Sequence, residues 1–230
     1  MVFHCLQHVP FEGPVLLESW AQQSGFAVKR SHLYKGDSFP EIESVDFLGI
    51  LGGPMNVYED KKYPWLKKEK KFIEKILKTK KKVIGVCLGA QLLAVVLGSR
   101  VFQNTYKEIG WFPVALDPAA KPLPILSGIP ASFLAFHWHG DTFDLPKQAK
   151  HLLRSHACFE QGFLYHNHVL GLQCHLEISR PSVTSLVKNC KADLGGGPFV
   201  QGPGLLLNPA GKFLKLKRIF NQWMDNFYNI

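Results

Sequence analysis

The stretch Val83-Ile84-Gly85-Val86-Cys87-Leu88-Gly89-Ala90-Gln91 joins a short β-branched strand to a small apolar helix. A cysteine stands at the junction, with one glycine two residues before it and another two residues after it. This pattern is the thiol counterpart of the Gly-x-Ser-x-Gly nucleophile elbow, whose sharp turn leaves no room for neighbouring side chains. The unpaired N–H groups and the dipole at the helix start favour the thiolate form of Cys87. We therefore predict a nucleophile here, although an isolated cysteine would more often be a buried core residue.

Strands and helices alternate on both sides of this junction. Short apolar segments are separated by segments with helical spacing, which is typical of a mostly parallel sheet with helices on both faces. Prolines punctuate residues 100–176, where we expect antiparallel or mixed strands. The glycine- and proline-rich residues 193–211 are expected to be an inserted loop. The expected strands include residues 2–6, 26–28, 45–51, 83–86 and 169–174, and the expected helices are residues 12–24, 64–79, 89–97, 179–192 and 212–228.

The composition is that of a single globular domain spanning residues 1–230. Hydrophobic residues make up 46% and charged residues 20%, which excludes disordered and collagenous proteins. No apolar run is long enough to cross a bilayer and no signal peptide is visible, so we expect a cytoplasmic protein without membrane contact. Five scattered cysteines without a C-x-x-C pair predict reduced thiols and no structural zinc site.

The positive charge of the chain is concentrated in one segment. Residues 61–82 contain eleven lysines and two acidic residues, so this segment alone carries the formal net charge of +9. The lysines fall on the polar face of the helix expected at residues 64–79, where solvated charge is the simplest interpretation. No aromatic residues are interleaved with them on that face, which argues against a nucleic-acid partner and leaves an acidic partner or a polyanion open.

A base for the thiol is offered by His175, which follows the strand expected at residues 169–174. Residues i and i+2 of an extended segment point to the same side, so the Glu177 carboxylate can reach the His175 imidazole. Such an acid holds the tautomer of the histidine and stabilises its protonated form. The spacing is common by chance, and it gains weight from the elbow at Cys87.

Gly52-Gly53-Pro54 follows the strand expected at residues 45–51. These residues either form a plain tight turn or present a backbone N–H to a reacting oxygen. In the second case the Gly53 N–H and the Leu88 N–H would form a two-donor oxyanion hole.

Taken in order, these motifs give the chain a family resemblance. They are Gly52-Gly53-Pro54-Met55-Asn56-Val57, Gly85 to Gln91 and Gln173-Cys174-His175-Leu176-Glu177, with further matches at Glu108-Ile109-Gly110-Trp111 and His137-Trp138-His139-Gly140-Asp141-Thr142. Over about residues 1–190 the chain resembles the class I, triad-type glutamine amidotransferases. It is most similar to the free-standing group that resembles the glutaminase domain of GMP synthetase. The resemblance implies a flavodoxin-like three-layer α/β sandwich.

The resemblance also implies an activity. Cys87, His175 and Glu177 would form a catalytic triad that hydrolyses the glutamine side-chain amide through a γ-glutamyl thioester, giving glutamate and ammonia. No cofactor or metal is implied. Gln91 matches a residue that helps to hold the substrate, and Gly140-Asp141 matches a segment near its amino-acid head group.

Three positions depart from the family pattern. Cys174 and Leu176 flank His175 where an aromatic residue and a proline are usual, so we expect a shifted local backbone with the triad side chains retained. Ala90 stands where many members have histidine.

The sequence leaves the physiological reaction open. It has no P-loop and no second core, so ammonia would pass to a separate synthetase. With a γ-glutamyl amide as substrate, the same triad would make a γ-glutamyl peptidase or hydrolase, and a catalytically silent regulatory binding module is a third reading. His137 and His139 share a face of a strand as metal ligands do, but the sequence places no third ligand beside them, and we expect no metal.

Overall fold

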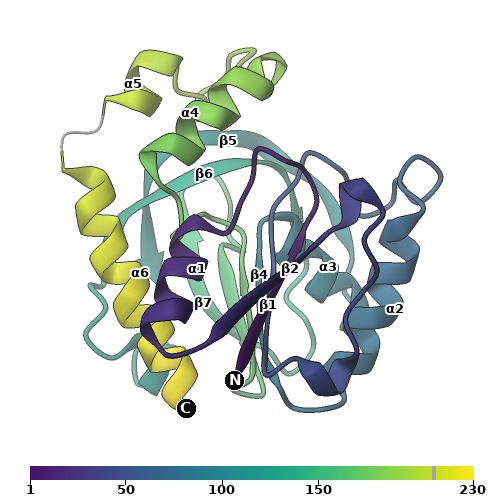
Figure 1. Cartoon of the computed structure of the whole chain (residues 1–230). Coiled ribbons are helices and arrows are strands. Elements are labelled where there is room, and N and C mark those ends of the chain that lie inside the picture. Colours follow the sequence, from purple (N-terminus) through teal and green to yellow (C-terminus); the bar gives the residue numbers. More distant parts are fainter. Residues whose placement is uncertain (209–210) are drawn as a thin grey trace.

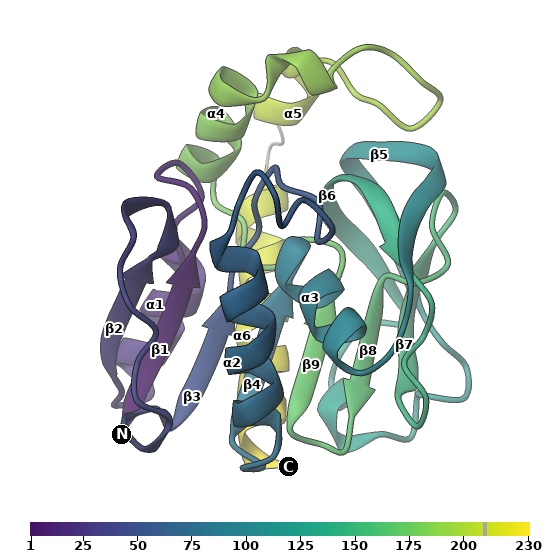
Figure 2. The ribbon, with the colours of Figure 1, turned by 90° about the vertical axis from the view of Figure 1, so that its right-hand side faces the viewer.

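The computed structural model describes residues 1–208 and 211–230 and shows one β-sheet between two layers of helices (Figures 1 and 2). The strands lie in the order β2-β1-β3-β4-β9-β8-β7-β5-β6. Pairing is parallel from β2 to β9 in this order and antiparallel beyond β9. The strands are β1 (Val2–Gln7), β2 (Ala27–His32), β3 (Phe47–Ile50), β4 (Lys82–Val86), β5 (Val101–Leu116), β6 (Ser132–Phe143), β7 (Lys150–Ser155), β8 (Gly162–Tyr165) and β9 (Val169–Leu172).

The parallel part of the sheet has the strand order of flavodoxin-like folds, with its topological switch at β1 and β3. The predicted α/β sandwich is therefore confirmed. The antiparallel strands continue the same sheet instead of forming a separate small one, because β8 pairs with β9 on one side and with β7 on the other. Strand β2 is longer than the three residues expected, since every one of its residues pairs with β1.

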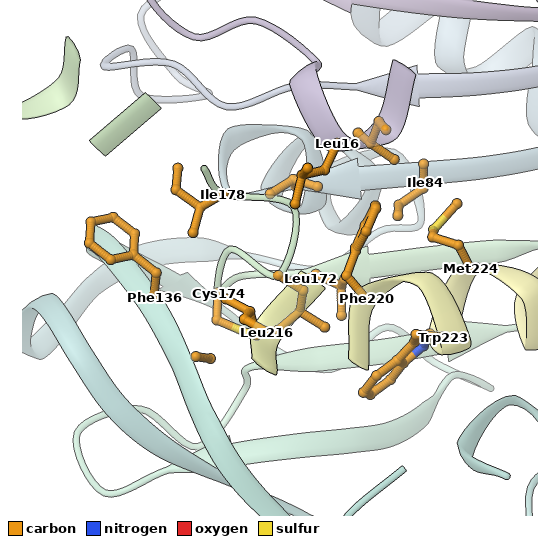
Figure 3. Packing of buried hydrophobic residues seen from close by; sticks show 14 of the residues in the cluster. Leu16, Ile84, Phe136, Leu172, Cys174, Ile178, Leu216, Phe220, Trp223 and Met224 are labelled. Atoms are coloured by element: carbon orange, nitrogen blue, oxygen red, sulfur yellow. The ribbon is translucent and has the colours of Figure 1, made fainter. Parts of the chain in front are cut away.

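Helices cover both faces of the sheet, each face with its own apolar core. Figure 2 shows α2 (Trp65–Leu77) and α3 (Leu88–Val96) in front of the strands and α6 (Lys212–Asn229) behind them. Helices α1 (Val15–Gln23), α4 (Arg180–Asn189) and α6 share one core, where Figure 3 shows Leu216 and Phe220 of α6 beside Leu172 of β9. Helices α2 and α3 build the other core. Within the described ranges, no helix is both long and apolar enough for a membrane span.

The segment at residues 193–211 is not the plain loop expected. It contains the short helix α5 (Pro203–Leu207), and residues 199–201 lie along β5. The Ile109 N–H donates to the Phe199 carbonyl and the Gln201 N–H donates to the Ile109 carbonyl, each at 2.8 Å. The Gln201 side chain also bonds the N–H and the carbonyl of Trp111, at 2.9 and 3.1 Å. Docking on β5 therefore orders the segment, whose residues 209 and 210 lie outside the described ones.

Candidate active site

A cavity of about 300 Å³ opens where the carboxyl ends of the parallel strands meet. Open α/β sheets bind their ligands at this edge, near the topological switch. The segments after β1, β3, β4 and β9 each bring residues to the cavity, and β5, β6 and α4 supply its remaining walls. Its lining includes Glu12, Gly53, Cys87, Gln91, Gly140, Asp141, His175 and Cys190.

Cys87 occupies a strained turn between β4 and α3. Its backbone has φ 52° and ψ −109°, a conformation that residues with side chains rarely adopt. Close packing explains the two flanking glycines. A Cβ on Gly85 would lie 2.5 Å from the backbone of Gly89, and a Cβ on Gly89 would lie 2.2 Å from the Ile50 carbonyl oxygen. The chain thus has the geometry of a nucleophile elbow, with Cys87 on the cavity wall.

His175 and Glu177 reach the same place from the end of β9. The His175 N–H donates to the Phe136 carbonyl at 2.8 Å, and His175 Nδ1 lies 2.7 Å from Glu177 Oε1. Since a carboxylate only accepts, Nδ1 carries a proton and Nε2 is the nitrogen left for the Cys87 thiol. Burial alone would lower the pKa of His175, but Glu177 and the hydrogen bond with Cys87 outweigh it and raise that pKa well above its usual value. A proton that leaves Cys87 is therefore stabilised on His175.

Gly52, Gly53 and Leu88 lie against this pair. A Cβ on Gly52 would be 3.5 Å from His175 Cε1 and 3.6 Å from Cys87 Cβ, and a Cβ on Gly53 would be 3.2 Å from Leu88 Cδ2. The Leu88 N–H is the first of α3 and has no intrahelical acceptor. Within the described residues the Gly53 N–H has no acceptor either. Two free N–H groups therefore lie close to the thiol, as an oxyanion hole requires.

The three residues expected at the substrate all line the cavity: Gln91, Gly140 and Asp141. The Gln91 amide is buried and donates from Nε2 to Gln173 Oε1 at 3.1 Å, which fixes its orientation. Asp141 Oδ2 accepts a hydrogen bond from the Tyr58 hydroxyl at 3.0 Å. The structure thus brings together every site residue that the sequence indicated.

Glu12 also lines the cavity, and it was not expected from the sequence. It lies in the segment after β1, and its Oε2 is 2.6 Å from the point that a Gly52 Cβ would occupy, beside the His175 ring. Burial raises the pKa of Glu12 to about 6, against the smaller attraction of His175 and His8. The signal that would have found it is topological, because an acid just after the first strand of a parallel sheet falls at the ligand-binding edge.

A buried pair of side chains, His8 and Glu69, lies behind the Gly52-Gly53 turn. His8 Nε2 is 2.9 Å from Glu69 Oε1, and His8 Nδ1 is 2.9 Å from the Gly52 carbonyl oxygen. In the sequence Glu69 belongs to a segment interpreted as solvated charge, but the structure buries it completely. Its spacing is the missed signal: Glu69 lies three residues after Leu66 and four before Ile73, inside the apolar stripe of α2.

The two histidines considered as metal ligands have a carboxylate beside them. Ligand atoms of Glu108, His137 and His139 lie within 4.8 Å of one another, so Glu108 is the third group that the sequence could not place. Glu108 Oε2 already accepts from Gln161 Nε2 at 2.6 Å and from Ser155 Oγ at 3.0 Å, and it lies 3.2 Å from His139 Nε2. The carboxylate is therefore the centre of a buried hydrogen-bond network behind the cavity wall, a role that needs no ion.

Known proteins resemble this chain in sequence and in structure. The family described as glutamine amidotransferase class-I matches residues 22–193. The glutamine amidotransferase-like protein YfeJ of Salmonella typhimurium is 32% identical over 208 residues, which cover 87% of each chain. A solved glutamine amidotransferase from Thermotoga maritima is 31% identical, with 100% of this chain and 99% of the other covered and a TM-score of 0.89. A glutamine-hydrolysing GMP synthase of Thermomicrobium roseum is 31% identical over 188 residues, 77% of this chain and 34% of the synthase.

Proposed function

Because this chain belongs to the class I glutamine amidotransferases, we propose that it hydrolyses the side-chain amide of glutamine to glutamate and ammonia. The observation that carries the proposal is the meeting of Cys87, on its strained elbow, with a His175–Glu177 pair joined at 2.7 Å. A thiol beside an oriented imidazole is the arrangement that nucleophilic catalysis needs. The free N–H groups of Gly53 and Leu88 lie beside the same thiol.

In the first half of the proposed reaction, the Cys87 proton moves to His175 and the sulfur attacks the amide carbon. The carbonyl oxygen becomes an oxyanion that accepts hydrogen bonds from the Gly53 and Leu88 N–H groups. The intermediate then collapses: the C–N bond breaks, His175 returns its proton to the leaving nitrogen, and ammonia departs from a γ-glutamyl thioester. Glu177 orients the imidazole throughout and stabilises its protonated form.

In the second half, water cleaves the thioester. His175 takes a proton from the water, whose oxygen attacks the thioester carbon and forms a second oxyanion at the same two N–H groups. The C–S bond breaks, the sulfur regains a proton from His175, and glutamate leaves. One imidazole therefore carries every proton of the cycle, and no oxidant or reductant is consumed.

The amino-acid part of the substrate is assigned to Gln91, Gly140 and Asp141 in this proposal. The Asp141 carboxylate offers an acceptor for an α-ammonium group, and Gly140 lets the backbone pass along the cavity without a side chain. The chain spans 34% of the Thermomicrobium roseum GMP synthase, which leaves the nitrogen-accepting reaction to another polypeptide. We therefore propose a separate synthetase as the partner that takes the ammonia.

The test measures glutamate and ammonia released from glutamine, beside a panel of γ-glutamyl peptides. Turnover of glutamine that is lost in Cys87→Ala and kept in Cys190→Ala supports the proposal. Cys190 is the matched control because it lines the same cavity, while burial raises the pKa of its thiol to about 11. Turnover of γ-glutamyl peptides without turnover of glutamine would favour a γ-glutamyl hydrolase. Folded protein that forms no adduct at Cys87 with a diazoketone analogue of glutamine would indicate a silent binding module.

A further inference from the structure

The proposed mechanism leaves the buried pair His8 and Glu69 unused. Both side chains are fully buried, and neither is among the residues that line the cavity. The His8 ring is held at both nitrogens, by the Gly52 carbonyl oxygen and by Glu69 Oε1, each at 2.9 Å. Trp65 stacks on the same ring, with centroids 5.3 Å apart and planes inclined by 14°. The imidazole is thus fixed on two edges and one face.

The hydrogen bond to Gly52 determines where the next N–H points. A carbonyl oxygen only accepts, so His8 Nδ1 carries the hydrogen of this bond. In a planar trans peptide the carbonyl oxygen and the amide hydrogen point in opposite directions. The Gly52 oxygen points to His8, behind the turn, so the Gly53 N–H of the same peptide points to the side of the cavity that Gly53 lines.

We infer that His8 and Glu69 are positioning residues, which hold the Gly52–Gly53 peptide so that its N–H faces the oxyanion. The inference rests on the proposed function, because an oxyanion forms only when Cys87 attacks a carbonyl carbon. Two successive glycines explain why the peptide needs such a support. Neither has a side chain to restrict its φ and ψ angles, so this peptide can rotate unless a group outside the turn holds it.

The charge of the pair strengthens this support. Burial alone would lower the pKa of His8, but the attraction and hydrogen bond of Glu69 outweigh it and raise that pKa above its usual value. A protonated imidazole donates a stronger hydrogen bond than a neutral one. Its positive charge lies behind the Gly52 oxygen, where it polarises the peptide and makes the Gly53 N–H a better donor to a negative oxygen.

Two substitutions separate the two contacts of His8. In His8→Asn the amide nitrogen can take the place of Nδ1 and donate to Gly52, while the contact with Glu69 is lost. In His8→Gln the amide can take the place of Nε2 and keep Glu69, while the donor to Gly52 is lost. We expect kcat for glutamine to fall about 100-fold or more in His8→Gln, the effect of losing an oxyanion donor, and less than about 10-fold in His8→Asn. KM should change less than about 3-fold in both, because this hydrogen bond strengthens only in the transition state.

Alkylation of Cys87 by iodoacetamide is the internal control. It displaces iodide from a saturated carbon and forms no oxyanion, so both His8 variants should react at the wild-type rate if the fold and the Cys87–His175 pair are intact. His151→Gln is the matched residue control. His151 is likewise held between a carboxylate and a carbonyl, 2.9 Å from Asp117 Oδ2 and 2.8 Å from the Phe159 oxygen, but away from the cavity lining. Its kcat should remain at the wild-type value.

Wild-type kcat in His8→Gln, or a larger loss in His8→Asn than in His8→Gln, would overturn the inference and leave the proposed function standing. If the wild-type chain turns over neither glutamine nor γ-glutamyl peptides, the proposed function fails and the inference fails with it. Should His8→Gln also alkylate slowly, its fold is disturbed and Glu69→Gln replaces it. That variant keeps the shape of the pair, and it should show the same split between reduced kcat and unchanged alkylation.

Discussion

Glu12→Gln should stabilise the protein at neutral pH, because the Glu12 carboxylate is costly to bury. Burial in the cavity raises the pKa of Glu12 from 4.5 to about 6. Between these pH values the folded state binds the proton more tightly than the unfolded state, so this group makes stability fall as the pH rises. Above both pKa values the difference amounts to about 2 kcal/mol of unfolding free energy. Glutamine cannot ionise and removes this cost.

The same linkage relation gives the expected gain at each pH. Glu12→Gln should raise the unfolding free energy by about 2 kcal/mol at pH 8 and by about 0.8 kcal/mol at pH 5. Urea unfolding followed by tryptophan fluorescence at the two pH values measures both gains in the same buffer. Glu41→Gln replaces an exposed acid and serves as the control, which should show no gain at either pH.

Two results would refute this reasoning. No gain at pH 8 would mean that the folded protein compensates the Glu12 charge fully, against the dominance of burial. An equal gain at pH 5 and pH 8 would mean that the variant is stabilised by packing of the amide and not by the loss of an ionisable group. The pH dependence, more than the size of the gain, therefore decides the question.

Two further substitutions probe the elbow and the oriented imidazole. Gly89→Ala places a Cβ 2.2 Å from a main-chain carbonyl oxygen, so we expect it to lower the unfolding free energy by about 3 kcal/mol or more. Gly204→Ala, whose Cβ meets nothing within 4 Å, should not destabilise the protein, and equal urea midpoints for the two variants would contradict the close packing. Glu177→Gln removes the carboxylate that raises the pKa of His175, so we expect kcat for glutamine to fall about 100-fold or more. Alkylation of Cys87 by iodoacetamide should also slow at pH 7, and a wild-type alkylation profile from pH 5 to 9 would show that Glu177 does not act through His175.

The parts of the site that could be predicted are those set by short local patterns. Cys87 follows from two glycines at fixed distances in a strand-to-helix turn, where backbone contacts leave no space for larger residues. The pairing of His175 with Glu177 follows from a spacing of two residues at the end of a strand. In both cases the geometry is decided within a few residues, so the sequence is sufficient evidence for it.

The parts that could not be predicted depend on contacts between distant segments. Glu69 meets His8 across 61 residues, and Glu108 meets His139 across 31. Neither local sequence names its partner, because the contacts arise only when the strands and helices are assembled. The docking of residues 199–201 on β5 is of the same kind, since a glycine- and proline-rich segment does not indicate which strand will accept its hydrogen bonds.

The backbone of Cys87 has a consequence for any form of this protein that gives up its chemistry. A side-chain-bearing residue at φ 52° and ψ −109° stores on the order of 1–3 kcal/mol of conformational energy. Alanine or serine at this position would keep that energy, whereas glycine would release it, because glycine adopts positive φ freely. Replacement of the cysteine by glycine is therefore downhill in folding free energy. Thermodynamics alone would empty this bend of its sulfur, and only selection for what the sulfur does can keep it there.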